Sequence, residues 1–515
     1  TQGYSSAASD VYKRQDKYIQ SIEAELEELD YNYPKDKRKI VSREQKISNI
    51  KAGIFTTKKE QELIRPINLG SSVDLPALMY SEEGFHFEVI KNNESGKPST
   101  DEETLTNLRL TVKKPDSPKA IFLDRLLELR GLEKMYKTYI EGWNEKVQDD
   151  DRLHGRFLIH GTTSGRLSSA EPNAQQIPKT SVDPNIKLQL KAPKGTLYIA
   201  SDFSQAELRI MAHLSGDETY LNAFNSGQDP HLAIAATKYH IPYEEALKIY
   251  EDENHPEHKI WKVRRKQAKQ IAFGLIYGIG AKLLAVKLSD PKSGIIVTPE
   301  EAQKEMDIFF GQHPKLKTFL KKQEKFLRKN GHLVSLFGRK RRLPQIYSND
   351  KGEEAYALRL ALNFPCQSAA SDMCLFGSIL IYYLMRQGKL PSTKSVCLVH
   401  DANYQITKPE NINIWSIYEM WQIYRNPLTK PYFGFQIDDV TMDMEFVIGR
   451  SMAEELPFIP GYDYKKMLEP DFSVEEYMEE HKKYKHIPIS EYKKRFNKQM
   501  KQYEKDFERT HGMES

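Results

Sequence analysis

The sequence contains little cysteine and no long uninterrupted apolar run. Among 515 residues, the three cysteines are Cys366, Cys374 and Cys397, without a CxxC or Cys/His spacing. This scarcity excludes a disulfide framework and a cysteine-based zinc site, and it fits a reducing compartment. The longest apolar run, Cys374 to Met385, spans about a dozen residues, whereas a membrane-spanning helix needs roughly 20. The composition therefore favours a cytoplasmic protein without a membrane partner.

The sequence also lacks a strong excess of charge of either sign. The net charge is +4, which is compatible with a nucleic-acid partner but does not argue for one. The densest basic cluster runs from Arg339 to Arg342, and a solvated turn explains it as well as a ligand contact does. A chain of 515 residues can bury a sizeable core and should divide into several subdomains.

Two apolar runs each lead into an aspartate. Leu197–Ala200 is typical of a buried strand that delivers Asp202, and Val396–Val399 delivers His400 and Asp401. A lone aspartate at a strand end is more often a turn or cap residue. Two strands, however, can place both carboxylates side by side, where they repel each other unless a divalent cation lies between them. Such oxygen ligands suit Mg²⁺ and the chemistry of two-metal phosphoryl transfer.

A second pattern combines cations and aromatic rings at a spacing of four residues. Its members are Arg265, Lys269, Phe273 and Tyr277, followed by Gly278 as the expected helix end. On a helix these side chains form one slowly drifting stripe. Cations can bind the phosphates of a nucleoside triphosphate, and the rings can stack on its base. The alternative interpretation is an ordinary amphipathic helix with a basic end. The presence of the paired aspartates elsewhere in the sequence makes this alternative less favoured.

In this order and spacing, three segments resemble the motifs of the family A DNA polymerases, which include bacterial DNA polymerase I and its phage relatives. The segments are Leu197 to Arg209, Arg265 to Gly278, and the region of His400 and Asp401. The resemblance extends from about Ile67 to about Val447. It implies an α+β, right-hand architecture with an antiparallel-sheet palm, helical fingers and a helical thumb. It also implies a DNA-directed DNA polymerase that extends a primer 3′-hydroxyl in the 5′–3′ direction during replication or repair.

The same resemblance assigns roles around the reacting phosphate. It implies catalytic roles for Asp202, Asp401 and Lys269, and metal-binding positions at Asp202, Phe203 and Asp401. The implied cofactor is a pair of Mg²⁺ ions, for which Mn²⁺ can substitute. Glu207 and Tyr277 should close the space beside the sugar C2′. The full set of implied nucleotide-binding residues is Gln205, Glu207, His231, Arg265, Lys269, Phe273 and Tyr277.

The implied partners are primer–template DNA and deoxynucleoside triphosphates. Polar residues on the Gly- and Pro-punctuated loop at 162–178 suit sugar-phosphate contacts. Arg359, Asn363 and Gln367 share one helical face, which suits the minor groove because that groove offers acceptors at every base pair. His400 is expected at the primer terminus, not as a base. The implied DNA-contacting residues are Arg130, Lys134, Arg166, Asn173, Gln176, Arg359, Asn363, Gln367 and His400.

We expect six regions along the chain. These are an unstructured or artefactual start (1–15), a thumb (16–140) with a basic insertion (34–65), the first part of the palm (141–214), the fingers (215–337), the second part of the palm (338–460) and a charged C-terminal tail (461–515). The insertion is either a thumb tip that touches phosphates or a solvated loop. The tail either grips DNA or a partner or, as we favour, is a solvated helical appendage.

Several expectations concern what surrounds this polymerase region. No acidic motif set of a 3′–5′ exonuclease precedes the thumb helix expected near Lys17, so the chain is identified as a polymerase region without that domain. We expect a monomer in the cytoplasm of a bacterium or a phage-infected cell, and the sequence leaves any processivity partner open.

Two positions depart from the family pattern. Ala402 stands where a glutamate is usual, and Ala272 stands where an asparagine is frequent. A non-catalytic DNA-binding relative is therefore an alternative, with Ala402 as the first sign of decay. A metal-dependent nuclease that uses the same two aspartates is a third possibility, but it leaves the cation–aromatic stripe unexplained.

Overall fold

The computed structural model describes residues 68–511, apart from 83, 94, 113, 181–182, 290–295, 426–433, 485–486 and 488. The expected start at 1–15 and the basic insertion at 34–65 lie outside the described residues, as does the rest of the expected thumb before residue 68. The chain divides into two compact units. The first comprises the chain up to Glu145 with Ala285–Val297, and the second comprises Lys146–Leu284 and Thr298–Ser515.

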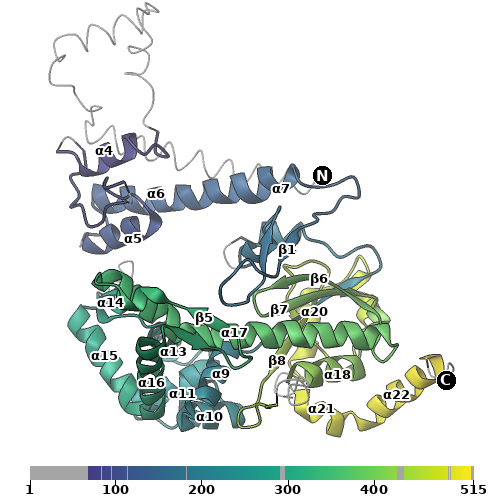
Figure 1. Ribbon diagram of the computed structural model, residues 1–515. Coiled ribbons are helices and arrows are strands. Elements are labelled where there is room, and N and C mark those ends of the chain that lie inside the picture. The colour runs from purple at the N-terminus through teal and green to yellow at the C-terminus, as the bar shows by residue number, and fades with distance from the viewer. Residues whose placement is uncertain are drawn as a thin grey trace, which may run out of the picture. The chain divides into compact units, whose positions relative to one another are not determined.

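The first unit is helical. Its helices are α4 (Asp74–Tyr80), α5 (Glu102–Thr111) and α6 (Pro118–Met135), which continues into the π-helix η2 (Tyr136–Glu141) and α7 (Gly142–Asn144) (Figure 1). α6 begins where Ser117 caps the backbone N–H of Ala120 and Pro118 occupies the first turn, a favourable helix start. Leu78, Leu105 and Phe122 are fully or almost fully buried and join the three longer helices around one apolar core.

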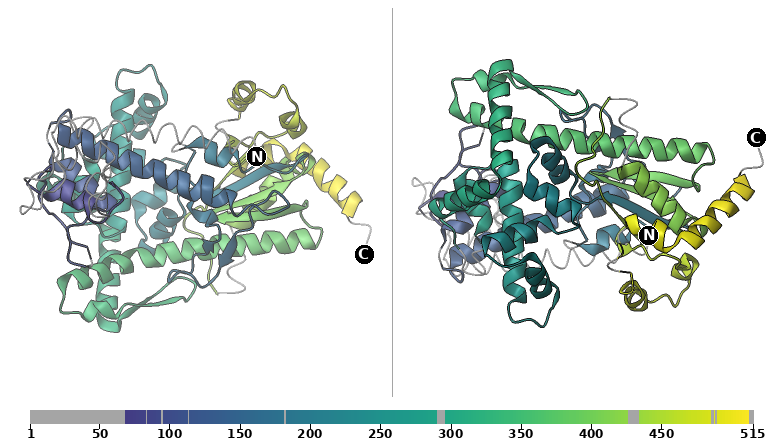
Figure 2. Two further views of the ribbon diagram at one scale, coloured as in Figure 1. Left: turned by 90° about the horizontal axis from the view of Figure 1, so that it is seen from above. Right: turned by 90° about the horizontal axis from the view of Figure 1, so that it is seen from below.

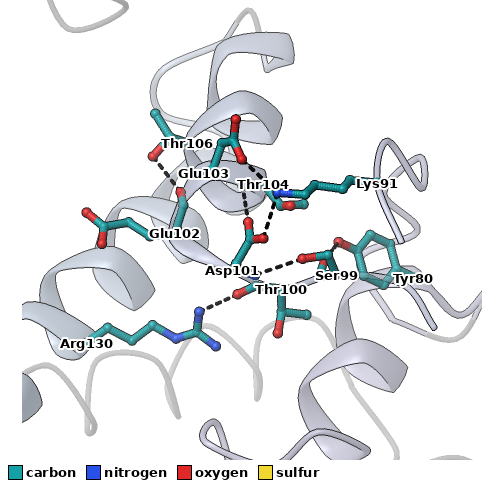
Figure 3. Close-up of polar contacts among 10 residues, drawn as sticks. All are labelled: Tyr80, Lys91, Ser99, Thr100, Asp101, Glu102, Glu103, Thr104, Thr106 and Arg130. Carbon is teal, nitrogen blue, oxygen red and sulfur yellow. Dashed lines mark hydrogen bonds and ion pairs between the residues drawn. The ribbon is translucent and has the colours of Figure 1, made fainter. Parts of the chain in front are cut away.

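A polar network fixes the segment that leads into α5 (Figure 3). Asp101 caps α5 by accepting the backbone N–H of Thr104 at 2.7 Å. Lys91 Nζ lies 3.0 Å from the Asp101 carboxylate. Arg130 of α6 donates to the backbone carbonyl of Thr100. The network therefore connects the start of α5 to α6 within the first unit.

Among the described residues of the second unit, five strands form an antiparallel sheet in the order β6-β7-β3-β8-β9. Their bounds are β3 (Leu197–Phe203), β6 (Thr393–Val399), β7 (Ala402–Thr407), β8 (Met444–Gly449) and β9 (Leu456–Pro457). The strand expected at 197–202 is confirmed and lies at the centre of the sheet. The second apolar run falls in β6, and Asp401 lies in the tight turn between β6 and β7.

Long helices cover one face of this sheet. They are α17 (Lys351–Arg386) and α18 (Ile414–Arg425), which lie alongside the strands in Figure 1. The Phe203 ring meets the Tyr424 ring edge-on at 5.6 Å between centroids. Asn403 Nδ2 donates to the Tyr424 hydroxyl at 2.9 Å. Phe203 of β3 and Asn403 of β7, which lie close to the two aspartates in the sequence, thus pack against Tyr424 of α18.

Most remaining helices of the second unit lie between β3 and α17 in the chain (Figure 2). Their bounds are α9 (Ala206–Ser215), α10 (Glu218–Asn225), α11 (Pro230–Lys238), α12 (Tyr243–Glu251), α13 (His258–Ile276), α15 (Pro299–Gln312) and α16 (Pro314–Asn330). The helix α14 (Ala281–Leu288) contains the boundary between the two units at Leu284 and Ala285. A capping box of Thr298 and Glu301 begins α15, and Gly331 ends α16 with a φ of 65°.

Shorter elements complete the second unit. They are β1 (Arg156–Leu158), β2 (Ser168–Ala170), η3 (Ala174–Gln176), α8 (Pro184–Leu188), β4 (His332–Val334), β5 (Lys340–Arg342), η5 (Pro344–Tyr347), η6 (Pro409–Asn411), η7 (Tyr464–Leu468), α20 (Val474–His481), α21 (Ile489–Arg495) and α22 (Asn497–His511). β1 pairs with β2, and the basic cluster forms β5, which pairs with β4.

The C-terminal tail differs from the favoured interpretation. Tyr464, Tyr477, Tyr492 and Met500 are all buried, and both α21 and α22 contact α18. The tail is therefore packed through its aromatic residues, although its charged side chains face solvent. The interpretation as a solvated appendage is wrong for these residues because their apolar surface finds a partner helix.

α17 is also longer than the apolar run predicted from sequence. It spans 36 residues and meets the length and composition criteria for a membrane span, with 44% of its most apolar window buried. A core helix of a globular protein meets the same criteria. Here α17 contacts α9, α16, α18 and β7, so its apolar side chains have partners within the second unit.

The contact between α17 and α18 generates a stability prediction. A Cβ added at Gly377 would lie 2.5 Å from Tyr424 Cδ1. We expect Gly377→Ala to lower the free energy of unfolding by about 1–3 kcal/mol, because overpacking forces the helices apart. Urea denaturation followed by tryptophan fluorescence measures the change.

Gly311→Ala is the matched control, because a Cβ at this helical glycine meets no atom within 4 Å. It should be neutral or stabilise by up to about 1 kcal/mol. Equal unfolding curves for the two variants would contradict the close packing of α17 on α18.

Candidate active site

The sheet register brings the two aspartates together. Asp202 of β3 pairs with Ala402 of β7, so Asp401 is one residue away from the position directly opposite Asp202. The backbone N–H of Phe203 donates to the Asp401 carbonyl at 3.4 Å. The antiparallel pairing thus holds two carboxylates at the same end of two adjacent strands.

Unusual backbone conformations flank both aspartates. Gln205, three residues after Asp202, has a φ of 57°, and His400, directly before Asp401, has a φ of 55°. Side chains other than glycine rarely adopt this left-handed region, and it costs on the order of 1 kcal/mol per residue. Such strain persists where the surrounding structure over-determines it, which is common at functional sites.

The carboxylates are held in an environment that disfavours their negative charge. Partial removal from water, followed by repulsion from Asp401 and Glu445, raises the pKa of Asp202 to about 7, although part of its side chain stays exposed. Burial likewise raises the pKa of Asp401, against the opposing effect of Arg166. Asp401 Oδ1 is buried and accepts no hydrogen bond from a described residue.

These features fit a divalent cation. Asp401 Oδ1 accepts no hydrogen bond from a described residue and lies beside a second carboxylate, so the two carboxylates are suitable ligands for a cation such as Mg²⁺. Phe203 is buried, so only its backbone faces the candidate site. No three His, Cys, Asp or Glu side chains among the described residues converge to form a metal-binding group. The site is therefore open, and a bound cation would keep water or substrate ligands.

Arg166 lies between the aspartates and the first turn of α9. Its guanidinium donates to one oxygen of Glu207 and lies 3.6 Å from Asp401 Oδ1. The Tyr277 hydroxyl donates to the other oxygen of Glu207. Burial and the Glu207 carboxylate raise the pKa of Tyr277 well above its usual value. The structure thus joins Glu207 and Tyr277, and it adds Arg166, which the sequence interpretation assigned to DNA contacts alone.

The cation–aromatic stripe lies on α13 as its spacing predicts. Tyr277 directly follows the last helical residue, and Gly278 has a φ of 70°. The rings of Phe273 and Tyr277 stack with 6.1 Å between centroids. Lys269 Nζ lies 5.7 Å from the centroid of the Phe273 ring. The stripe is therefore continuous from the ammonium group to the second ring.

Arg265 has a partner that the sequence interpretation missed. Its Nη2 lies 2.5 Å from Asp229 Oδ2, and Asp229 also caps α11 by accepting the backbone N–H groups of His231 and Leu232. The Asp229-Pro230 pair is a helix-start pattern, which signals the cap but not the ion pair. Asp229 therefore orients the guanidinium of Arg265.

His231 is less accessible than its expected role requires. Its side chain is 1% exposed, and neither ring nitrogen has a hydrogen-bond partner among the described residues. Burial lowers its pKa to about 4, against the opposing effect of Asp229, so the ring is neutral at pH 7. The ring lies 5.7 Å from that of Phe273. The ring would have to become exposed before it could contact a phosphate.

Some of the residues expected to contact DNA form hydrogen bonds within the protein, and others are exposed to solvent. The guanidinium of Arg130 donates a hydrogen bond to the backbone carbonyl of Thr100 within the first unit (Figure 3). Lys134 is exposed on the same helix. Asn173 caps η3 through the backbone N–H of Gln175, and Gln176 is exposed. Arg130 and Asn173 therefore have structural duties that the sequence pattern did not indicate.

Arg359, Asn363 and Gln367 lie on α17 at the expected spacing of four residues. Arg359 is exposed, and Gln367 is partly exposed. Asn363 Oδ1 is buried and has no hydrogen-bond partner among the described residues. The three side chains follow one stripe of the helix, as the spacing predicts.

A hollow of about 290 Å³, which is open to solvent, lies beside His400. Its lining includes Arg166, Gln175, Ser371, Cys374, Leu398 and His400. Gln175 Nε2 donates to the Leu398 carbonyl at 3.2 Å. The sequence interpretation named Gln176 as a DNA contact, and the structure places the neighbouring Gln175 at this hollow. No sequence pattern indicated that Ser371 would line this hollow, since small residues are common in helix cores.

The chain was compared with known proteins. The sequence profile of "DNA polymerase family A" matches residues 37–413. The thermostable DNA polymerase I of Thermus aquaticus is 32% identical over 319 residues, which cover 62% of this chain and 35% of that relative. DNA polymerase I of Pseudomonas aeruginosa is 32% identical over 336 residues, 65% of this chain and 33% of the relative. The chain thus spans about a third of the length of these relatives.

A solved structure is also similar. It is the polymerase domain of Pol1 from M. smegmatis in complex with DNA primer–template and dNTP. The TM-score is 0.63 at 26% sequence identity, and the match covers 87% of this chain and 67% of that chain. The α+β fold expected from the sequence is therefore shared with a solved polymerase domain.

The raised pKa of Asp202 predicts how cation binding depends on pH. A cation binds the deprotonated carboxylate, so protons compete with it below the pKa of about 7. The apparent affinity for Mn²⁺ should fall by roughly tenfold per pH unit below this value and level off above it. Calorimetric titration across this range, in buffers of different ionisation enthalpy, measures the affinity and the proton release.

The control is Asp202→Asn, which should lose both the affinity and its pH dependence. An affinity of the wild-type chain that stays constant across the range would contradict the carboxylate pair as the binding site.

Proposed function

The chain belongs to the DNA polymerase family A, and on this premise we propose that it is a DNA-directed DNA polymerase. It adds deoxynucleotides to the 3′-hydroxyl of a primer in the 5′–3′ direction, in DNA replication or repair. The observation that carries the proposal is the pairing of Asp202 and Asp401 at one end of β3 and β7. Neither a structural sheet nor a simple DNA-binding surface requires two such carboxylates together.

Asp202 and Asp401, with the backbone of Phe203 beside them, are the residues that would hold two Mg²⁺ ions, for which Mn²⁺ can substitute. When bound, these ions supply Lewis-acid stabilisation of charge on the phosphoryl group and its attacking and leaving oxygens. The unpartnered Asp401 Oδ1 supports this assignment. Arg166, 3.6 Å from the same oxygen, provides positive charge next to the carboxylates.

The nucleotide site extends along α13. Arg265 and Lys269 bind the phosphates, and the ion pair with Asp229 orients Arg265 in advance. Lys269 is exposed, so its ammonium group can donate a proton to the leaving pyrophosphate. Phe273 stacks on the incoming base, and His231 joins the phosphate contacts once its ring becomes exposed. Gln205 lies at the start of α9, next to this site.

Glu207 and Tyr277 close the space beside the sugar C2′. The hydrogen bond from the Tyr277 hydroxyl to Glu207 and the ion pair of Glu207 with Arg166 fix the carboxylate at both oxygens. A carboxylate fixed in this way cannot turn aside for a 2′-hydroxyl. The arrangement therefore supports selection of deoxynucleotides over ribonucleotides.

The proposed partner is primer–template DNA, as in the solved relative with DNA primer–template and dNTP. The contacting residues are Arg130, Lys134, Arg166, Asn173, Gln176, Arg359, Asn363, Gln367 and His400. The five-stranded sheet and α9 correspond to the palm (141–214 and 338–460), α10 to α16 to the fingers (215–337), and α4 to α6 to the thumb (16–140). We further propose a cytoplasmic monomer.

A non-catalytic DNA-binding relative is the second candidate, and Ala402 is the observation that favours it. The two aspartates, the stripe on α13 and the Tyr277–Glu207–Arg166 network are all retained, and DNA binding alone requires none of them. Primer extension in the presence of Mg²⁺ separates the two candidates, because only the polymerase lengthens the primer.

Removal of either aspartate tests the metal assignment. Asp202→Asn and Asp401→Asn should each lower primer extension by at least about a thousandfold, because the carboxylates hold the cations on which the chemistry depends. Affinity for primer–template should stay within about threefold, since it comes mainly from phosphate contacts. Single-turnover extension and fluorescence anisotropy measure the two quantities, and substantial turnover by either variant would refute the assignment.

Glu207 tests the choice of sugar. Glu207→Ala should raise ribonucleotide incorporation relative to deoxynucleotide by about tenfold or more, because it opens the space beside C2′. Glu207→Gln keeps the shape and one acceptor for Tyr277, so it should stay close to the wild type. The ribo-to-deoxy ratio of kcat/KM is the measurement, and equal ratios in the wild type and Glu207→Ala would exclude Glu207 from this role.

A further inference from the structure

A third carboxylate lies in the same cross-strand row as Asp202. The sheet register pairs Asp202 with Ala402 of β7 on one side and with Glu445 of β8 on the other. Residues directly opposite each other in an antiparallel sheet project to the same face. Ala402, Asp202 and Glu445 therefore form one row across three strands.

The carboxylates of this row are accessible, and the cation that interacts with Glu445, Arg209, forms no direct ion pair with it. Asp202 and Glu445 are both exposed, whereas the flanking Met444 and Phe446 point to the buried face. No ion pair within 4.0 Å joins either carboxylate to a Lys, Arg or His nitrogen of the residues that the structure describes. Like charges directly opposite each other destabilise a sheet by about 0.2–1 kcal/mol. A cation bound near the row would offset this repulsion.

Ala402 cannot contribute to such a cation, because its side chain is a methyl group and is 8% exposed. Glu445 is then the residue of this row that can add negative charge next to Asp202. Glutamate is one methylene longer than aspartate, so its carboxylate extends further from the sheet. That reach suits a hydrogen bond to a water ligand of the cation better than direct coordination.

Resting on the proposed function, we propose that Glu445 is a positioning residue of the metal site. It supplies, from the β8 side of Asp202, a carboxylate that Ala402 cannot supply from the β7 side. Its carboxylate accepts a hydrogen bond from water on the cation held by Asp202, and thereby orients that water and increases the affinity of the site. No bond to the cation and no proton transfer is required of Glu445.

Glu445→Gln tests this role, because it keeps the shape of the side chain and removes its charge. Mn²⁺ binding to the full chain, followed by the electron paramagnetic resonance signal of free Mn²⁺, should weaken by about tenfold. The Mg²⁺ concentration for half-maximal primer extension should rise by a similar factor, and higher Mg²⁺ should recover the rate.

Two further variants sharpen the experiment. Glu410→Gln removes one exposed carboxylate from η6, which follows the opposite end of β7, so it should leave Mn²⁺ binding unchanged. Ala402→Glu in the Glu445→Gln background should restore most of the lost affinity, because it returns a carboxylate to the row from the other side. Rescue of this kind distinguishes a role in cation binding from a general effect on folding.

The outcomes separate this inference from the proposed function. Wild-type Mn²⁺ affinity in Glu445→Gln would overturn the inference while leaving the polymerase proposal intact. A loss as large as that of Asp202→Asn, without recovery at high Mg²⁺, would also overturn it, since Glu445 would then be a direct ligand. If the wild type binds Mn²⁺ through Asp202 and Glu445 but does not extend a primer, the polymerase proposal fails and the role of Glu445 stands.

Discussion

The structure depends on holding Asp202 and Asp401 together against their mutual repulsion. The pairing of β3 with β7 sets their separation, and the N–H of Phe203 fixes the Asp401 backbone. Tyr424 supports both strands from beneath through Phe203 and Asn403. Repulsion between two carboxylates and a strained backbone next to each of them both oppose folding. The helices packed on the sheet must therefore provide the stability that is lost where the two aspartates lie at the strand ends.

A single hydrogen-bonded chain connects this edge to the helix that presents the cation–aromatic stripe. It runs from Tyr277 to Glu207, then to Arg166, whose guanidinium lies near Asp401. Arg166 partly balances two carboxylates that belong to different parts of the site. In the proposed polymerase, a cation that approaches Asp401 would compete with Arg166 for the same oxygen, and a nucleotide sugar would compete for the space beside Glu207. Events at the two parts of the site are thus coupled through one side chain.

The sequence predicted local features well and long-range partners poorly. The strand that carries Asp202 and the stripe on α13 with its end at Gly278 depend on residues that lie close together in the sequence, so periodicity reveals them. The Arg265–Asp229 ion pair and the packing of α21 and α22 on α18 depend on contacts between distant segments. The burial of His231 likewise results from how α11 packs on α13. No spacing rule within one segment encodes these contacts.

The same limit applies to the charge of the site. The sequence motif alone shows that Ala402 follows Asp401, which suggests that the site binds metal more weakly. The sheet, however, sets the electrostatic neighbours of Asp202 across strands, and there Glu445 is as close in register as Ala402. A carboxylate missing from one strand can therefore be balanced by one on the opposite neighbour, because a cation responds to the total charge around it and not to the order of residues. The negative charge around Asp202 is therefore set by the row of residues across β7, β3 and β8.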